Sequence, residues 1–212
     1  MTFSKFALVP LCCAFLFACK QKEQPKTAPP KIVQDSMVNA QPENAYNSYA
    51  SVDISPMDMS YFPVDYPKLK MANEEIAPPL VRVVYSRPHL GKRHFHDILK
   101  YGAPWRLGAN ESTEITFYKN ATILGKKVQA GRYILYCVPQ PDSWTMALNT
   151  NIDTWGLKQD SLKDVNRFEI PVSRNNPPLE FFTMVFEKTA TGADLVIGWD
   201  DVIARMPIVF NP

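Results

Sequence analysis

LEFFTMVFEKTATGADLVIGWDDVIARMPIVF, residues 179–210, carries the strongest secondary-structure signal of the chain. Apolar side chains recur at every second position over residues 179–187 and again over residues 194–199, which is the period of a β-strand. Residues 189–192, Thr-Ala-Thr-Gly, lie between these two runs and are typical of a turn. The pattern therefore predicts an antiparallel hairpin, and the alternating run over residues 202–210 predicts a third strand.

Asp200-Asp201 separates the second of these strands from the third, and we interpret it as another turn rather than as an acid/base pair. Apolar runs of strand length extend the pattern back to residue 79. They cover residues 80–86, 114–119, 133–138, 144–148 and 168–172. Helix-like patterns occur only near residues 94–101 and 159–165. The prediction is an all-β fold, an antiparallel β-sandwich of about eight to nine strands with one or two short helices, preceded by a disordered linker.

The first residues of the chain resemble an export signal. A single lysine, Lys5, precedes an apolar run over residues 6–18, which is too short for a membrane-spanning helix of ~20 residues and fits a secretory signal peptide. The run ends in Leu16-Phe17-Ala18-Cys19, which resembles the bacterial lipobox. This resemblance implies a lipoprotein signal peptide over residues 1–18 and acyl chains, such as palmitate, on Cys19 that anchor the protein to a membrane. A plain signal peptide with an incidental Cys19 is the alternative.

The next segment differs in composition from the rest of the chain. Residues 19–78 contain no glycine and many prolines, and they show no sustained strand or helix period, so we interpret them as a lipid-anchored, disordered or extended linker. Aromatic residues within 46–66 either pack on the domain as an arm, which we favour, or bind a partner. The domain itself is predicted over residues 79–212. The expected location is the bacterial cell envelope. The lipid anchor is expected in the outer membrane, with the domain on either its periplasmic or its surface face.

Cysteine and charge limit the possible functions. After removal of the signal, Cys137 is the one thiol besides Cys19, and its apolar strand context indicates a buried structural residue. Residues 82–132 carry ten basic side chains against three acidic ones, while residues 133–212 carry six against ten. The basic half either attracts anions or pairs with the acidic half. Nucleic acid is not an expected partner, because the basic residues are not interleaved with a base-stacking platform.

Several short sequence motifs in the domain are more distinctive than its alternating strand pattern, which many β-proteins share. They are YSRP at residues 85–88, YGAPWRLGANESTEITF at residues 101–117, GKKVQAGRYILY at residues 125–136, SWTMALN at residues 143–149 and WG at residues 155–156. Over about residues 80–210 the chain resembles the uncharacterised bacterial family named domain of unknown function 2911. That family brings no established activity, so the resemblance leaves the function open.

The segment over residues 86–111 runs from the end of one predicted strand to the start of the next, and it is long for a loop and rich in polar side chains, which favours a functional role. Arg87, Trp105, Arg106, Asn110 and Glu111 are predicted to converge at one mouth of the sandwich. The two guanidinium groups suit a carboxylate or phosphate, Trp105 supplies an apolar wall, and Asn110 and Glu111 suit a hydroxyl-bearing ligand. In the alternative, purely structural interpretation, Glu111 pairs with an arginine, Asn110 adopts a left-handed turn and Trp105 fills the core.

The histidines suggest a metal site as a further hypothesis. His94 and His96 are candidate ligands, but a His-x-His pair presents both rings on one face only in a strand, and this segment has a helical or loop pattern. A solvated polar turn is the favoured alternative. We therefore predict no metal and no cofactor.

These observations favour a non-catalytic binding or envelope-structural module. Its expected partners are the membrane, through Cys19, and a small anionic or glycan ligand or an envelope protein. The alternative is a hydrolase that acts on an anionic or glycan substrate at the Arg87/Arg106/Asn110/Glu111 mouth. No nucleophile elbow, phosphate-binding glycine loop or Cys/His framework is present, so we assign no catalytic residue and leave enzymatic activity open.

Overall fold

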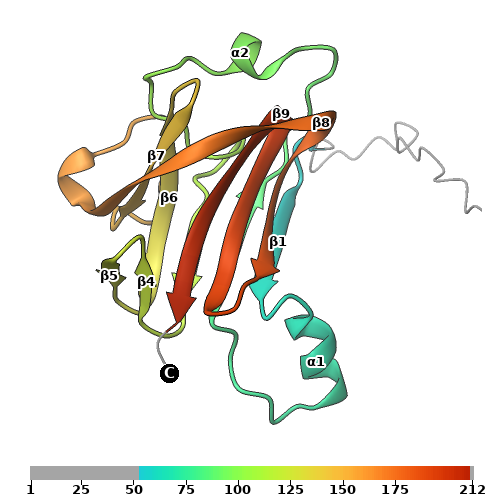
Figure 1. Cartoon of the computed structure of the whole chain (residues 1–212), viewed down its shortest axis with the longest axis vertical. Helices are drawn as coiled ribbons and strands as arrows, with labels where there is room; N and C mark the ends of the chain where they lie inside the picture. Colours follow the sequence, from blue (N-terminus) through green and yellow to red (C-terminus); the bar gives the residue numbers. More distant parts are fainter. Residues whose placement is uncertain (1–52, 211–212) are drawn as a thin grey trace, which may run out of the picture. The chain divides into compact units, whose positions relative to one another are not determined.

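The computed structural model describes residues 53–210, so the predicted signal peptide, Cys19 and most of the predicted linker lie outside it. The described chain forms nine strands, two short α-helices and one 3₁₀ turn (Figure 1). The strands are β1 (Met57–Phe62), β2 (Val81–Ser86), β3 (Glu114–Phe117), β4 (Ala121–Ile123), β5 (Lys126–Val128), β6 (Gly131–Pro139), β7 (Ser143–Asn149), β8 (Asp164–Lys188) and β9 (Gly192–Phe210). The helical elements are α1 (Tyr66–Ala72), α2 (Phe95–Ile98) and η1 (Ser161–Lys163).

All neighbouring strands are antiparallel, in the order β1-β2-β3-β6-β7-β8-β9-β4-β5, which confirms the predicted fold class. The long strand β8 joins two layers. Its residues 164–171 pair with β7, and its residues 172–188 pair with β9. Register shifts after Arg174 and Leu179 interrupt the second ladder, and such irregularities let a strand bend. Figure 1 shows β8 crossing the molecule, with the loop that carries α2 at the top of the view.

The core lies between the two layers and follows from the alternating pattern. Val81, Val83 and Ile115 from one layer are fully buried together with Leu195 and Ile197 from the other. The core ends in an aromatic cluster with ring centroids 5.0–6.4 Å apart, within the range of favourable aromatic pairs. The members of this aromatic cluster are Phe95, Trp105, Trp144, Phe182 and Trp199.

The predicted turn at Asp200-Asp201 is wrong, because β9 continues through both residues. Asp200 has a positive φ of 55°, the local conformation that makes aspartate common in turns. The ladder with β8 nevertheless persists on both sides: Gly198 pairs with Thr183, and Val202 pairs with Arg174. The side chain of Asp200 is buried and binds the backbone of another segment, so tertiary contacts override the local turn signal.

The domain also begins earlier than the predicted boundary at residue 79. β1 pairs with β2 along its full length, and Phe62 packs against Phe186 and Phe210. Part of the aromatic segment 46–66 therefore packs on the sheet, as favoured, while Tyr46 and Tyr49 lie outside the described residues. Helix α1 was not predicted; Pro67 lies in its first turn, and none of its residues is buried.

Two smaller predictions are confirmed. The helix-like patterns near residues 94–101 and 159–165 correspond to α2 and η1. Cys137 is completely buried in β6, and burial raises the pKa of its thiol well above the usual value, as expected for a structural cysteine. Within residues 53–210, no helix is long and apolar enough to cross a membrane.

Candidate ligand-binding site

The segment between β2 and β3 is held on the aromatic cluster by backbone contacts. Trp105 forms an isolated antiparallel bridge with Cys137 of β6, in which the amide of each residue donates to the carbonyl of the other at 2.7 and 2.9 Å. After this bridge the chain turns sharply, and Gly108 lies so close to β2 that an added Cβ would come within 2.9 Å of the carbonyl oxygen of Ser86. The glycine of the WRLGAN string therefore permits the close approach of this segment to the sheet.

A cavity of about 300 Å³ lies beside Trp105; we call it the Trp105 cavity. Its lining is apolar except for Arg106, the one charged side chain among the lining residues. The lining residues are Pro88, Ile98, Leu99, Pro104, Trp105, Arg106, Gly108, Ala109, Gly156, Leu157 and Trp199. A cavity of this size and character is suited to a small, mainly apolar molecule with one polar group.

Arg106 carries a charge that the described residues do not neutralise. Its Nη1 donates to the carbonyl oxygen of Trp155 at 2.9 Å, and its guanidinium lies 5.7 Å from the centre of the Trp155 ring. Burial lowers the pKa of Arg106, with no opposing contribution from a carboxylate in residues 53–210. The guanidinium retains its charge at neutral pH, because an arginine side chain does not lose its proton in this range. An anionic ligand would supply the missing counter-charge.

A second, polar cavity of about 370 Å³ contains three carboxylates, and we call it the acidic cavity. It is lined by Glu111, Ser112, Glu114, Arg132, Asp153, Thr154 and Trp155. Arg132 binds two of these carboxylates: its guanidinium donates to Glu114 at 2.7 and 2.6 Å and also to Asp153. Glu111 forms no ion pair with any arginine of the described chain, so the pairing considered in the structural alternative is not present.

One loop separates the two cavities. Trp155 faces the acidic cavity, whereas Gly156 and Leu157 line the Trp105 cavity. Gly156 has a φ of 76°, and a Cβ at this position would overlap the hydroxyl of Ser112 and approach the Cβ of Arg106 at 3.1 Å. Glycine is therefore required for both the backbone conformation and the tight packing of this shared wall.

The Gly156→Ala variant should lose about 1–2 kcal/mol more unfolding free energy than Gly125→Ala. Both glycines have nearly the same positive φ, 76° and 78°, so the conformational strain is matched. An added methyl at Gly125 meets nothing within 4 Å, whereas at Gly156 it meets Ser112. Urea unfolding of the two variants gives the comparison, and equal losses would show that the wall is not tightly packed.

The five predicted ligand residues do not converge on one site. Trp105 and Arg106 share the Trp105 cavity, while Glu111 lies in the acidic cavity. Arg87 forms an ion pair with Asp58 at 3.3 Å and donates to the carbonyl oxygen of Phe182 at 3.2 Å, so it joins β1 to β8. The tight turns of the segment point neighbouring side chains in different directions, and spacing along the sequence does not reveal this.

Asn110 also has a structural contact. It has a positive φ of 55°, as the structural alternative expected, and its side chain donates to Asp53 Oδ2 at 3.0 Å and to the carbonyl oxygen of Ser55 at 3.3 Å. It thereby ties the residues before β1 to the domain. Sequence analysis gave no role to Trp155, Gly156, Leu157 or Trp199, although the WG string was already among the family-like motifs.

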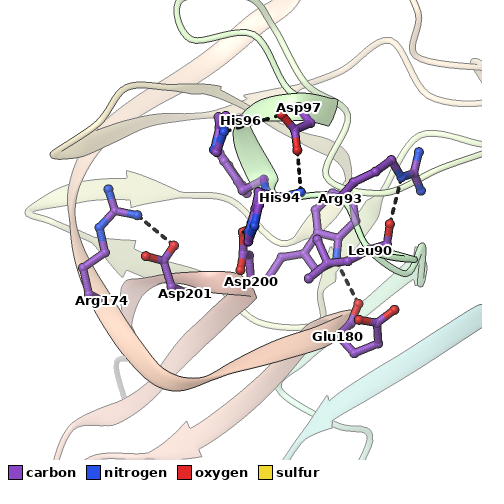
Figure 2. A network of polar contacts seen from close by, with 11 residues as sticks. Leu90, Arg93, His94, His96, Asp97, Arg174, Glu180, Asp200 and Asp201 are labelled. Carbon is purple, nitrogen blue, oxygen red and sulfur yellow. Dashed lines mark hydrogen bonds and ion pairs between the residues drawn. The ribbon is translucent and has the colours of Figure 1, made fainter.

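The histidines bind neighbouring carboxylates (Figure 2). His94 Nδ1 lies 3.2 Å from Asp200 Oδ2, and His96 Nε2 lies 3.5 Å from Asp97 Oδ1. The amide of His94 donates to Asp97 at 2.8 Å, which closes the first turn of α2 and lowers the pKa of Asp97. No group of three or more potential metal ligands occurs in residues 53–210. In the structure these side chains fix the start of α2.

By its fold and its cavities, the protein is an antiparallel β-sheet domain with an apolar cavity and an acidic cavity that adjoin each other. The chain belongs to the family described as Protein of unknown function (DUF2911), whose model matches residues 67–208. The match begins within α1, upstream of the region in which the sequence strings occur. No curated protein and no solved structure matches the chain.

Proposed function

We propose that this protein is a non-catalytic binding module of the bacterial cell envelope and that its Trp105 cavity binds a small amphiphilic anion. The observation that carries the proposal is the state of Arg106, a partly desolvated guanidinium without a carboxylate partner in an otherwise apolar cavity. Withdrawing a charge from water without a counter-charge is unfavourable, so a ligand anion at this position gains a strong, charge-assisted hydrogen bond.

The geometry limits the class of ligand. The cavity volume of about 300 Å³ is at the small end of ligand sites and excludes a large folded partner from its interior. Trp105 and Trp199 contribute aromatic surface, and Ile98, Leu99 and Leu157 contribute aliphatic surface. A carboxylate or phosphate on a short alkyl or aryl body therefore fits best.

The location in the envelope is the second part of the proposal. It is supported by the lipobox-like Leu16-Phe17-Ala18-Cys19 and by the Pro-rich segment that follows it. Acyl chains on Cys19 would hold the domain at a bacterial membrane, and the intervening chain would allow it to reach ligands near that surface.

The acidic cavity favours a second candidate function, hydrolysis of a glycan. An exposed tryptophan beside carboxylates is a surface on which a sugar can stack and form hydrogen bonds. A glycosidase of the common type needs two working carboxylates. Arg132 already binds Glu114 and Asp153, which leaves Glu111 as the one carboxylate without such a partner in the described site. This arrangement favours binding over hydrolysis.

A thermal-shift series with hexanoate, octanoate, benzoate and naphthoate tests the main proposal. At least one of these anions should raise Tm by mass action, and Arg106→Gln should weaken its binding about tenfold or more. Arg205→Gln, on an exposed pair with Glu187, is the matched control and should bind normally. Glu111→Gln should also bind normally. No shift with any member, or equal binding by Arg106→Gln, contradicts the proposal.

A further inference from the structure

The loop that joins β7 to β8 exposes an unusual amount of apolar surface. We call residues 150–163 the Trp155 loop. The exposed fractions of its three most exposed apolar side chains are 56% for Trp155, 76% for Leu157 and 94% for Leu162. Single exposed apolar residues are normal on protein surfaces, but a group of them on one loop indicates an interaction site.

Polar contacts hold this loop in a defined shape. Its ends are joined by a hydrogen bond from the Thr150 amide to the carbonyl oxygen of Lys163 at 3.0 Å. Within the loop, the Gln159 side chain donates to the carbonyl oxygen of Gly156 at 3.1 Å, and Asp160 accepts from the Leu162 amide at 3.2 Å. Closed loops of this length are frequently functional. The apolar side chains are therefore held outward by an ordered scaffold.

We propose that the Trp155 loop inserts its apolar side chains into the surface of a lipid bilayer. Tryptophan and leucine flanked by lysines are the residues that interfacial membrane-binding segments use, and the loop contains Lys158 and Lys163. Figure 1 shows the connection between β7 and β8 projecting from the sheet at the left of the view. A projecting loop with several separately exposed apolar side chains suits a fluid lipid surface, whereas protein partners favour broad apolar patches with a polar rim.

The charges of the loop are compatible with this contact. Asp153 is bound by Arg132, and Asp160 accepts a hydrogen bond from the amide of Leu162, so each carboxylate of the loop has a partner. Insertion is then driven by the burial of apolar surface, and the two lysines add attraction to anionic lipid headgroups.

The loop also connects the membrane to the Trp105 cavity, and this step rests on the proposed function. Leu157 is both an exposed residue of the loop and part of the cavity lining. A docked loop would place the cavity beside the lipid surface, where single-chain amphiphilic anions concentrate. The source of the ligand would be the bilayer rather than the surrounding solution.

Quenching of tryptophan fluorescence by brominated phosphatidylcholine tests the insertion in the full chain reconstituted with phosphatidylcholine/phosphatidylglycerol vesicles. All four tryptophans of the chain lie in the described part, and Trp105, Trp144 and Trp199 are at most 8% exposed. Trp155 is therefore the reporter, and the predicted anchor at Cys19 contributes no signal. Quenching is expected in the native chain, and Trp155→Phe should remove most of it.

The double variant Leu157→Ser/Leu162→Ser should reduce the docked population, measured as quenching, about tenfold or more. The control double variant Met71→Ser/Leu124→Ser removes two apolar side chains of comparable exposure from α1 and from the turn between β4 and β5, and it should be quenched normally. Absence of quenching in the native chain, or equal quenching in both double variants, overturns the proposal. Binding of the test carboxylates in solution is measured separately, so failure of the membrane contact is distinguishable from failure of the ligand site.

Discussion

Replacing Trp105 by alanine is expected to lower the free energy of unfolding by about 3–5 kcal/mol, the usual cost of truncating a buried tryptophan. Trp105 is 8% exposed, and its ring contacts Phe95, Trp144, Phe182 and Trp199. Its indole N–H also donates to the carbonyl oxygen of Gly108 at 3.3 Å. The substitution removes the central ring of the aromatic cluster and leaves a void that the rigid sheet cannot close.

Urea unfolding monitored by far-UV circular dichroism measures this effect. Trp155→Ala is the matched control, because the same side chain is removed from an exposed position, and its cost should stay below about 1 kcal/mol. A loss of less than about 1 kcal/mol in Trp105→Ala would mean that the aromatic cluster is not a packed core. In that case the Trp105 cavity would have no rigid floor, and the proposed ligand site would lose its basis.

Adjacent residues of the family-like WRLGAN string thus have different roles. Trp105 stabilises the fold and forms a wall of the cavity, while Arg106 also lines the cavity and holds its partly desolvated guanidinium against Trp155. The sequence motif contains both residues, but it does not show which of them stabilises the fold and which carries the charge at the cavity. Their separation depends on the bridge between Trp105 and Cys137, which is formed by residues 32 positions apart.

The strand pattern was predictable because the period of two is a local property. Ile115 and Phe117 are buried and alternate with the half-buried Glu114 and Thr116, and the buried face of the sheet follows directly from this alternation. Strand β1 was missed for the corresponding reason. It is short, two prolines lie close to it, and its apolar residues Met57 and Met59 are exposed, so only its pairing with β2 identifies it as part of the sheet.

The candidate site was only partly predictable. The sequence correctly directed attention to the segment between β2 and β3, where Arg106 and Glu111 line neighbouring cavities. It did not indicate that the wall between them comes from the loop between β7 and β8, about 45 residues further along the chain. Long-range juxtaposition of this kind depends on the order of strands in the sheet, which local patterns do not encode.

Asp200 and Asp201 also show that local sequence patterns do not reveal long-range contacts. The two residues are neighbours in the chain, but their side chains have different partners. Figure 2 shows Asp200 beneath His94, at the start of α2, while Asp201 faces Arg174. One oxygen of the buried Asp200 carboxylate accepts from the Phe95 amide at 2.9 Å and lies 3.2 Å from His94 Nδ1. Asp201 forms an exposed ion pair with Arg174 at 2.8 Å. The buried carboxylate therefore anchors α2, whereas the exposed pair is screened by solvent.

Asp200→Ala is accordingly expected to cost about 2–3 kcal/mol, because it removes a hydrogen bond to a charged acceptor and leaves the buried Phe95 amide without a partner. Asp201→Ala should cost less than about 1 kcal/mol, as exposed ion pairs do. Urea unfolding compares the two, and hydrogen exchange should show faster exchange of the Phe95 amide in Asp200→Ala alone. Equal stabilities of the two variants, with unchanged exchange at Phe95, would mean that β9 does not hold α2 over the aromatic cluster.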